Sequence, residues 1–401
     1  MERILLIGLN YAPDRTGIPP YTTGAAEGLA GQCAAVHVIT GYPHYPSWRI
    51  PPQYRGLTMR EEIGGVPVLR LRHPVPADGN PLVRVAMELV FGLRAVFSDW
   101  GRPSVVLAVS PALLSTALVV ARARLTGVPV VVWVQDIYTL GVTETGAGGL
   151  ATRPLRAVES WTMRNATRVI GIHQRFKRFL TDQLGVPADR VDVVRNWTHV
   201  PASPGRSEET RARLGWDPDH TIVLHAGNMG AKQNLQSVVR ASRIAAKREA
   251  PVTFVLLGDG HRKSDLVAMG GNSRLQFLDP LPDGEFESAL ASADVLLVNE
   301  LPGMTEMSVP SKLTSYFSTG LPVLAAVDPG SVTAEEIESS GGGRCVPPDD
   351  PDALVDAALA LRDSDLAAGL GAAGLRYQTT ELGSGAAMDR LHASLRRAAG
   401  N

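Results

Sequence analysis

Short apolar segments alternate with helix-length segments along this chain, and this alternation restricts the possible folds more than any other feature. Several of the apolar segments carry Val, Ile or Leu at almost every position, which is typical of parallel strands buried on both faces. The order predicts a doubly wound parallel sheet with helices of the kind seen at 111–125, 153–166 and 174–185. The first series of apolar segments occupies residues 3–9, 35–40, 66–71, 105–109, 128–135, 167–172 and 190–194.

A second series of the same kind follows a break. Residues 200–220 are rich in Pro, Ser and charged side chains and lack the apolar pattern. We therefore predict an α/β protein of two Rossmann-like lobes, residues 1–204 and 205–380, that face each other across a cleft. Residues 381–401 are expected to form a helix that packs back on the first lobe. The apolar segments of the second series are 221–227, 252–258, 274–279, 293–299, 321–327 and 342–347.

The charge and cysteine content exclude several classes of protein. The 401 residues include 39 basic and 40 acidic side chains, a formal net charge of −1, so no nucleic acid is expected as a partner. Cys33 and Cys345 are too few for a disulfide framework or a zinc site, which favours a cytoplasmic location. No segment reaches the roughly 18 uncharged apolar residues of a membrane span. Residues 81–97 mix apolar and basic side chains, so a peripheral contact with the inner face of the plasma membrane stays open beside an ordinary buried helix.

The turn GNMGAK after the segment 221–227 has the composition of a phosphate site. Strands of a doubly wound sheet end at one edge, where loop amides and helix N-termini bind ligands. Gly227 and Gly230 place no side chain where a phosphate approaches the backbone, and Lys232 supplies a positive charge. The alternative is a glycine-rich turn with an exposed lysine. Gly258, in the turn after the next strand, is expected near the nucleotide base.

The loop after the segment 293–299 leads into a helix with unusual polar residues. Glu306 precedes the helix, Ser311 and Lys312 lie in its first turn, and Ser315 follows one turn later. A carboxylate accepts strong hydrogen bonds from sugar hydroxyls, whereas serine and lysine donors at a helix N-terminus suit a phosphate. In the alternative, Ser311 only caps the helix and Lys312 is solvated.

Three residues of the first half follow predicted strands and are candidates for the same edge. Gly17 would let the backbone approach a phosphate, unless it is an ordinary loop glycine. Asp136 follows the segment 128–135, where its carboxylate can orient an acceptor hydroxyl or take its proton, and a helix cap is the equal alternative. His173 is a further candidate on the acceptor side, beside a structural role.

The motifs resemble, in order and spacing, those of family 4 glycosyltransferases with the GT-B fold. They are similar to the WcaI-like, colanic-acid type members, which act in exopolysaccharide biosynthesis. The resemblance implies a retaining hexosyltransferase that moves a sugar from a nucleoside diphosphate sugar, bound by the second lobe, to a hydroxyl acceptor on the first lobe. The acceptor would be a sugar, a lipid-linked saccharide or a small molecule, with Asp136, Lys232 and Glu306 in catalytic roles. The residues that carry the resemblance are 8–30, 36–48, 134–142, 193–197, 225–241, 256–266 and 305–323.

This sequence departs from the family pattern at two places. Asn228 stands where many members carry an arginine, and Lys232 lies about one position early. In the helix motif Ser315 replaces the second of two glutamates, and Glu306 takes the place of the first after a shift of one residue. Ser315 can still bond a ribose hydroxyl. The resemblance also implies that the loop ending at Leu281 borders the base.

No metal or other cofactor is expected. Residues 350–352 and 363–365 have the Asp-x-Asp spacing that some glycosyltransferases use for a metal ion. Both pairs precede Ala/Leu-rich segments, where aspartates cap helices, and neither follows a strand. Lys232 and helix N-termini would then neutralise the leaving diphosphate, which can itself accept the proton of the acceptor.

Two other functions stay open. A sugar-nucleotide epimerase of the same two-lobed fold would use the donor site without an acceptor. A non-catalytic nucleotide-sugar-binding protein would need no reacting groups. An NAD-dependent oxidoreductase is disfavoured, because residues 8–17 lack the Gly-x-Gly-x-x-Gly spacing after the first strand.

Overall fold

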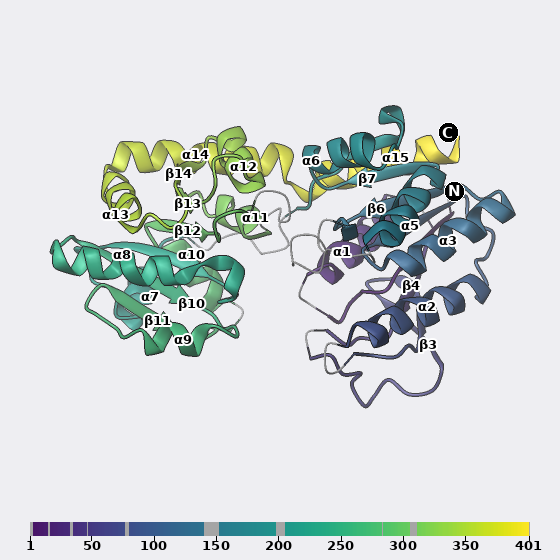
Figure 1. The fold of residues 1–401 in the computed structure, drawn as a ribbon, viewed down its shortest axis with the longest axis horizontal. Helices are drawn as coiled ribbons and strands as arrows, with labels where there is room; N and C mark the ends of the chain where they lie inside the picture. Colours follow the sequence, from purple (N-terminus) through teal and green to yellow (C-terminus); the bar gives the residue numbers. More distant parts are fainter. Residues whose placement is uncertain are drawn as a thin grey trace. The chain divides into compact units, whose positions relative to one another are not determined.

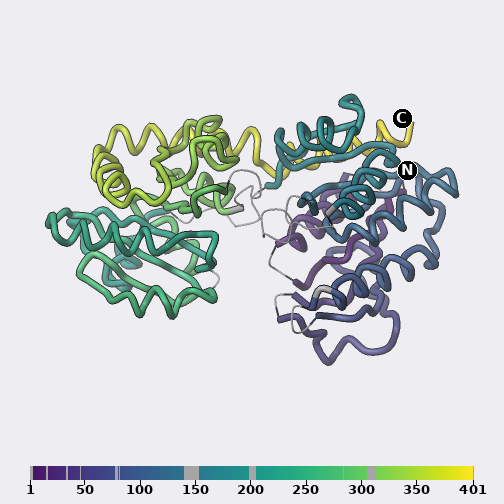
Figure 2. The backbone as a smooth tube through the Cα atoms, viewed as in Figure 1, coloured from purple at the N-terminus to yellow at the C-terminus, as the bar shows by residue number. Residues whose placement is uncertain are grey.

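The structure is a computed structural model that describes residues 3–14, 17–32, 35–45, 47–76, 80–139, 152–197, 205–282, 284–304 and 311–400. The chain divides into two compact units, Met1–Asn196 with Ser384–Asn401, and Trp197–Gly383 (Figure 1). Each unit holds one sheet of mainly parallel strands with helices packed on it, which confirms the predicted fold class for each unit. The chain returns to the first unit for its last helix, as the trace in Figure 2 shows.

The first unit is built on a sheet whose strands, within the described ranges, have the order β3-β4-β2-β1-β5-β6-β7-β8. Strands β5 and β6 are buried at every position, as expected of central parallel strands covered on both faces. The strands are β1 (Arg3–Gly8), β2 (Ala35–Gly41), β3 (Thr58–Ile63), β4 (Val66–Leu71), β5 (Val105–Ser110), β6 (Val130–Val134), β7 (Arg168–Gly171) and β8 (Val191–Val193).

Strand β3 is absent from the sequence prediction. It pairs antiparallel with β4 through a turn of two residues, Gly64 and Gly65, whose φ angles are 56° and 77°. Two successive residues with positive φ match the twist of a tight hairpin. Every second residue of β3 is exposed at the sheet edge, so its sequence TMREEI lacks the apolar run of a buried strand.

The terminal segment of the chain completes the first unit. Helix α15 packs against α1 and against strands β5, β6 and β7. Gly28 permits this approach, because a Cβ there would lie 2.6 Å from Sδ of Met388. The helices of this unit are α1 (Pro19–Gly31), α2 (Pro81–Phe97), α3 (Leu113–Thr126), α5 (Thr152–Asn165), α6 (Gln174–Arg178), which continues as a π-helical turn (Phe179–Gln183), and α15 (Ser384–Ala399), with a 3₁₀ turn at Ala188–Arg190.

The second unit contains a parallel sheet of strand order β11-β10-β9-β12-β13-β14 in the part of the chain that is described. Its strands are β9 (Thr221–Ala226), β10 (Val252–Leu257), β11 (Leu275–Leu278), β12 (Val295–Asn299), β13 (Val323–Ala326) and β14 (Gly343–Val346). Its helices are α7 (Glu208–Arg213), α8 (Leu235–Lys247), α9 (Lys263–Ala268), α10 (Glu285–Ser292), α11 (Ser311–Phe317), α12 (Val332–Ser340), α13 (Pro351–Ala360) and α14 (Ser364–Glu381).

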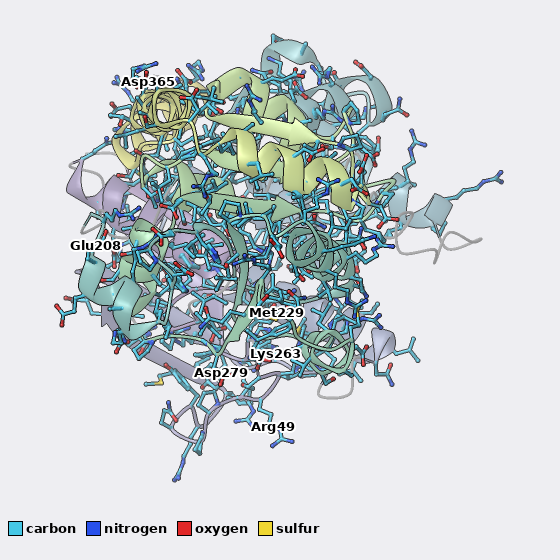
Figure 3. The ribbon with its side chains drawn as sticks, turned by 90° about the vertical axis from the view of Figure 1, so that its left-hand side faces the viewer. Arg49, Glu208, Met229, Lys263, Asp279 and Asp365 are labelled. Atoms are coloured by element: carbon cyan, nitrogen blue, oxygen red, sulfur yellow. The ribbon has the colours of Figure 1, made fainter. Side chains whose placement is uncertain are left out.

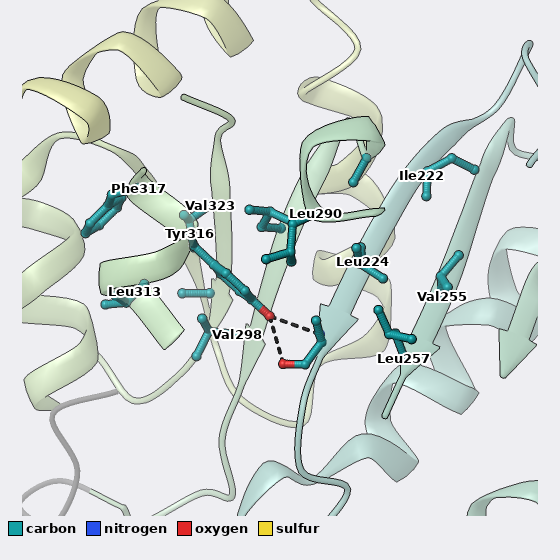
Figure 4. Close-up of a cluster of buried hydrophobic side chains, with 14 of the residues drawn as sticks. Ile222, Leu224, Val255, Leu257, Leu290, Val298, Leu313, Tyr316, Phe317 and Val323 are labelled. Carbon is teal, nitrogen blue, oxygen red and sulfur yellow. Dashed lines mark hydrogen bonds between the residues drawn. The ribbon is translucent and has the colours of Figure 1, made fainter. Parts of the chain in front are cut away.

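Both faces of this second sheet carry an apolar core. Alternate side chains of a strand point to opposite faces, so Ile222 and Leu224 join one buried cluster and Val223 joins the other. The first cluster lies under α10, α11 and α12 (Figure 4), and the second lies under α8 and α13. Because helices cover both faces of the sheet, the strand ends are the part of the sheet where a ligand can reach the backbone.

Candidate functional site

Two glycine turns meet at the carboxyl edge of the second unit's sheet. The backbone N–H of Gly227 donates to the carbonyl oxygen of Leu257 at 2.8 Å. A Cβ on Gly258, whose φ is 136°, would lie 2.1 Å from the carbonyl oxygen of Gly227, so a larger residue does not fit. The turns after β9 and β10 are therefore packed backbone against backbone.

Paired side chains lie on the neighbouring loops of this edge. Nζ of Lys263 donates to the carbonyl oxygen of Gly258 at 2.8 Å and to Oδ1 of Asp279 at 2.6 Å. Figure 3 labels Met229, Lys263 and Asp279 near one another on this unit. The charge of Lys263 is thus already balanced by a carboxylate.

Lys232 lies on a 3₁₀ turn, Ala231–Gln233, with its side chain exposed. Its carbonyl oxygen accepts a hydrogen bond from the backbone N–H of Leu301 at 2.8 Å. Nδ2 of Asn299 donates to the carbonyl oxygens of Gln233 at 2.8 Å and Asn234 at 3.0 Å. These bonds hold the loop after β12 beside the first glycine turn, so the side chain of Lys232 projects from a fixed backbone.

Lys312, in the first turn of α11, lies against the same glycine turn. A Cβ placed on Gly227 would be 3.3 Å from Cε and 3.6 Å from Nζ of Lys312. That Nζ lies 3.1 Å from Nε2 of His225, which is fully buried at the end of β9. Burial lowers the pKa of Lys312 to about 7 and holds the pKa of His225 well below its usual value. The alternative of a solvated Lys312 is therefore wrong, because the amine is packed between the glycine turn and His225.

Glu300, directly after β12, adds a carboxyl group to this edge and acts electrostatically on Lys312. It accepts a hydrogen bond from Oγ1 of Thr333 at 2.6 Å. Burial raises the pKa of Glu300 to about 7, and the charge of Asp328 adds to the increase. The amine beside the glycine turn thus interacts electrostatically with a carboxyl group, and the pKa values of both are shifted to about 7.

Tyr316 fixes α11 against strand β9. Its hydroxyl accepts a hydrogen bond from the backbone N–H of Ala226 at 3.0 Å (Figure 4). The ring is buried with Leu313, Phe317 and Val298 in the apolar cluster of that face. A helix of seven residues is too short to be stable alone, so this packing decides where Lys312 lies.

The remaining donor-side residues lie at several places in the second unit. Glu306 lies outside the described residues, and only the backbone of Ser311 is described, at the start of α11. Ser315 is half-buried, and Asn228 is exposed with its carbonyl oxygen 3.4 Å from Nε2 of the buried histidine. Leu281 packs against the apolar cluster under α10. The ligand contacts assigned to these residues stay predictions.

The first unit places its three predicted residues after strands β1, β6 and β7. Gly17 is exposed with φ of 83°, and a Cβ there would meet no described atom within 4 Å. Asp136 is exposed in the loop after β6. His173 is buried, and its Nδ1 accepts from the backbone N–H of Arg175 at 3.2 Å, so the imidazole caps α6. The acceptor-side roles of these residues stay predictions.

Glu159 and Gln135, which the sequence analysis did not select, lie beside Asp136. Glu159 of α5 is buried and accepts from the backbone N–H of Tyr138 at 2.8 Å, so it holds the loop that carries the aspartate. Oε1 of Gln135 accepts from Nδ2 of Asn196 at 2.9 Å. Nε2 of Gln135 and Oδ1 of Asn196 are buried without a hydrogen-bond partner among the described residues. The sequence signal that could have found this group is Gln135, a polar residue at the end of an otherwise apolar strand.

Two family descriptions match the chain, one in each unit. "Glycosyl transferase 4-like domain" matches residues 16–197, and "Glycosyl transferases group 1" matches residues 220–364. The chain belongs to the GT-B glycosyltransferases. The resemblance stated from the motifs is thereby confirmed.

Relatives of this glycosyltransferase match it over most of its length. The "Putative colanic acid biosynthesis glycosyl transferase WcaI" of Escherichia coli (strain K12) is 28% identical over 371 residues, covering 88% of this chain and 90% of the relative. The structure of sucrose-phosphate synthase from Thermosynechococcus elongatus matches with a TM-score of 0.72 at 17% identity, over 99% of both chains. Anabaena Alr3699/HepE in complex with UDP-glucose matches with a TM-score of 0.68 at 15% identity, over 99% of this chain and 100% of that one. These two structures share the fold.

The first aspartate of each Asp-x-Asp pair of this glycosyltransferase caps a helix, as predicted. Oδ1 of Asp350 accepts from the backbone N–H of Ala353 at 2.9 Å. Oδ1 of Asp363 accepts from the N–H groups of Asp365 at 3.0 Å and Leu366 at 3.1 Å. In the described part of the chain, His, Cys, Asp and Glu side chains form no group of three or more that could hold a metal ion.

A hollow of about 470 Å³ in the first unit of the glycosyltransferase lies away from the predicted residues. It is lined by Arg3, His37 and Trp100, among others, near the amino ends of strands β1 and β2. Ligands of doubly wound sheets bind at the carboxyl ends of the strands. We therefore assign no donor or acceptor role to this hollow.

Proposed function

We propose that this glycosyltransferase moves a sugar from a nucleoside diphosphate sugar, bound by the second unit, to a hydroxyl acceptor bound by the first. The observation that carries the proposal is the glycine turn at 227–230 with the amine of Lys312 at its side. A turn without side chains, which lets a phosphate approach the backbone, and a nearby cation suit a diphosphate. The fold relative from Anabaena was solved with UDP-glucose, and the E. coli relative is named for colanic acid biosynthesis. The first supports a nucleoside diphosphate sugar as the donor, and the second supports a role in the biosynthesis of a polysaccharide or glycoconjugate.

The proposal includes a hexosyl donor, retention of anomeric configuration and no metal ion. The departing diphosphate would receive the acceptor proton, while Lys232, Lys312 and backbone amides stabilise its charge. This mechanism requires no pair of catalytic carboxylates, so it is compatible with Ser315 in place of a glutamate. Asp136 would orient the acceptor hydroxyl, with Nε2 of Gln135 as a neighbouring donor.

Thermal stabilisation by UDP, GDP and ADP, and then by their sugar conjugates, tests the donor site. A ligand that binds only the folded protein raises the melting temperature. We expect stabilisation by nucleotides of one base, and no stabilisation by any of them would contradict the proposal. Product analysis with and without a panel of sugar acceptors then separates the functions. Conversion of the donor to an epimer without acceptor would identify an epimerase, and binding without turnover would identify a binding protein.

Lys232→Ala is expected to remove most of the stabilisation by the nucleotide, because it deletes an exposed cation beside the glycine turn. The melting temperature without ligand should stay unchanged, since the side chain is exposed. Lys247→Ala, at the other end of α8, is the matched control and should bind like the unaltered protein. An unaltered ligand-induced shift in Lys232→Ala would refute the role of Lys232.

We further propose that helix α2 rests on an anionic lipid surface. Among the described helices, none is both long and apolar enough to cross a bilayer. Glu88 is buried, whereas Arg84 and Arg94 lie on the same helix, so its outer face carries basic charge. Exposed apolar side chains, 38% to 85% accessible, recur along α2 every three or four residues and form one stripe: Leu82, Val85, Leu89, Leu93 and Phe97.

The double variant Leu89→Glu with Leu93→Glu is expected to reduce binding to phosphatidylglycerol vesicles about tenfold or more in a flotation assay. The two carboxylates interrupt the apolar stripe and repel anionic headgroups. Leu375→Glu, an exposed apolar position of the second unit, is the matched control and should float as before. Equal flotation of the double variant and the control would contradict the lipid contact.

A further inference from the structure

We propose that Lys312 takes up a proton when a nucleoside diphosphate binds, and that His225 is the positioning residue that permits this. The inference rests on the proposed function, because it requires a diphosphate at the turn 227–230. It assigns a separate role to each residue. Lys312 provides a positive charge only when the diphosphate binds, and the buried imidazole of His225 holds the lysine side chain in place.

The partners of Lys312 differ from those of the other lysine at this edge. Lys263 bonds the carboxylate of Asp279, so its charge is balanced before any ligand binds. Among the described residues, no carboxylate forms an ion pair with Lys312, and its close polar partner is Nε2 of His225 at 3.1 Å. A carboxylate there would keep the lysine charged but would compete with a diphosphate for it. A neutral partner leaves the amine available to the ligand.

His225 is suited to hold the amine in either protonation state. The ring is fully buried, and a second positive charge 3.1 Å from an ammonium would be strongly unfavourable, so His225 stays neutral. A neutral imidazole nitrogen accepts a hydrogen bond from an ammonium in one tautomer and donates to a free amine in the other. Nε2 also lies 3.4 Å from the carbonyl oxygen of Asn228, which offers a second acceptor for the ring N–H.

The surroundings decide in which direction the proton moves. Glu300, directly after β12, acts to raise the pKa of the amine, Asp328 acts electrostatically on Glu300, and the hydroxyl of Tyr316 is bonded to the strand backbone. Without ligand, burial lowers the pKa of Lys312 to about 7, so the amine is largely neutral above that pH. An incoming diphosphate brings negative charge next to Nζ and favours the ammonium. Binding therefore takes up a proton, and affinity falls as the pH rises.

Calorimetric titration measures this uptake directly. The probe is UDP or GDP, whichever stabilises the protein in the thermal screen, titrated in two buffers of different ionisation enthalpy. Above about pH 7 the terminal phosphate of the nucleotide is mostly ionised, so its own titration contributes little. We expect an uptake of about half a proton at about pH 7 and about 0.9 proton at about pH 8. The affinity should fall about fivefold between those two pH values and about tenfold from pH 8 to 9.

Variants assign the proton to a residue. Lys312→Met should abolish the uptake, whereas Glu300→Gln should keep it. His225→Gln retains an acceptor at the position of Nε2 and should preserve both affinity and uptake, whereas His225→Leu should lose affinity and flatten its pH dependence. If His225→Leu does not fold, His225→Gln decides alone, and a loss of affinity or of proton uptake in that variant would overturn the positioning role.

The outcomes separate this inference from the proposed function. Nucleotide binding without proton uptake would overturn the inference and leave the donor site intact. Uptake that persists in Lys312→Met and disappears in Glu300→Gln would assign the proton to the carboxyl group and would also overturn it. A lower melting temperature in His225→Leu with an unaltered pH dependence of affinity would show that His225 is only structural. No binding of any nucleotide would refute the proposed function itself.

Discussion

Lys312→Met is expected to weaken the binding of a nucleoside diphosphate about ten- to hundredfold at neutral pH, measured by calorimetry. A charge-assisted hydrogen bond contributes about 1.5–3 kcal/mol, and Lys312 is the cation packed against Gly227. Methionine has a similar length and no charge, so the packing of α11 should remain. The ligand-free melting temperature is expected to stay constant or rise, because a partly buried amine is removed.

Lys263→Met is the matched control for this variant. Lys263 lies at the same edge of the sheet, but its charge is paired with Asp279. Its loss is expected to change nucleotide affinity by no more than about threefold. Equal losses of affinity in the two variants would mean that only the general charge of this edge matters, and would contradict the assignment of Lys312 to the diphosphate.

Gly258→Ala is expected to destabilise the second unit by about 3–5 kcal/mol and to abolish nucleotide binding. The new Cβ would lie 2.1 Å from the carbonyl oxygen of Gly227, and the backbone at Gly258 has φ of 136°, which alanine rarely adopts. The two glycine turns would have to separate, and the backbone amides of the phosphate site would move with them. Thermal unfolding should show a decrease of roughly 10 °C in the melting temperature of this unit.

Gly271→Ala is the matched control, since a Cβ there meets no described atom within 4 Å and its φ is not positive. It should unfold and bind nucleotide like the unaltered protein. If Gly258→Ala did the same, the close contact between the turns after β9 and β10 would not exist in solution.

The parallel sheets were predictable because each buried strand is a local apolar run. Strands β5 and β6 are buried at every residue, and the sequence there offers no polar alternative. Strand β3 was not predictable in the same way, because an edge strand with alternating exposure resembles an ordinary polar segment. Its pairing depends on the turn at Gly64 and Gly65, whose strand-forming effect appears only when both flanking segments are known.

The residues of the candidate site were likewise predictable only where the pattern is local. Gly227, Gly258 and Lys232 were selected from short motifs, because a glycine turn after a strand carries its chemistry within a few residues. His225 and Glu300 were not selected, although each is a polar residue at the end of an apolar strand. Their importance comes from their interaction with Lys312, which lies 87 residues from His225, and no local pattern reveals such an interaction.

Local sequence was enough for the order of the buried strands, the glycine turns and the capping role of Asp350 and Asp363, since each depends on neighbouring residues. Folding alone brought the amine of Lys312 against a neutral histidine and next to Gly227. Whether that lysine is charged depends on its burial and on charges from distant parts of the chain, which act through space. The linear order of the residues does not contain this information.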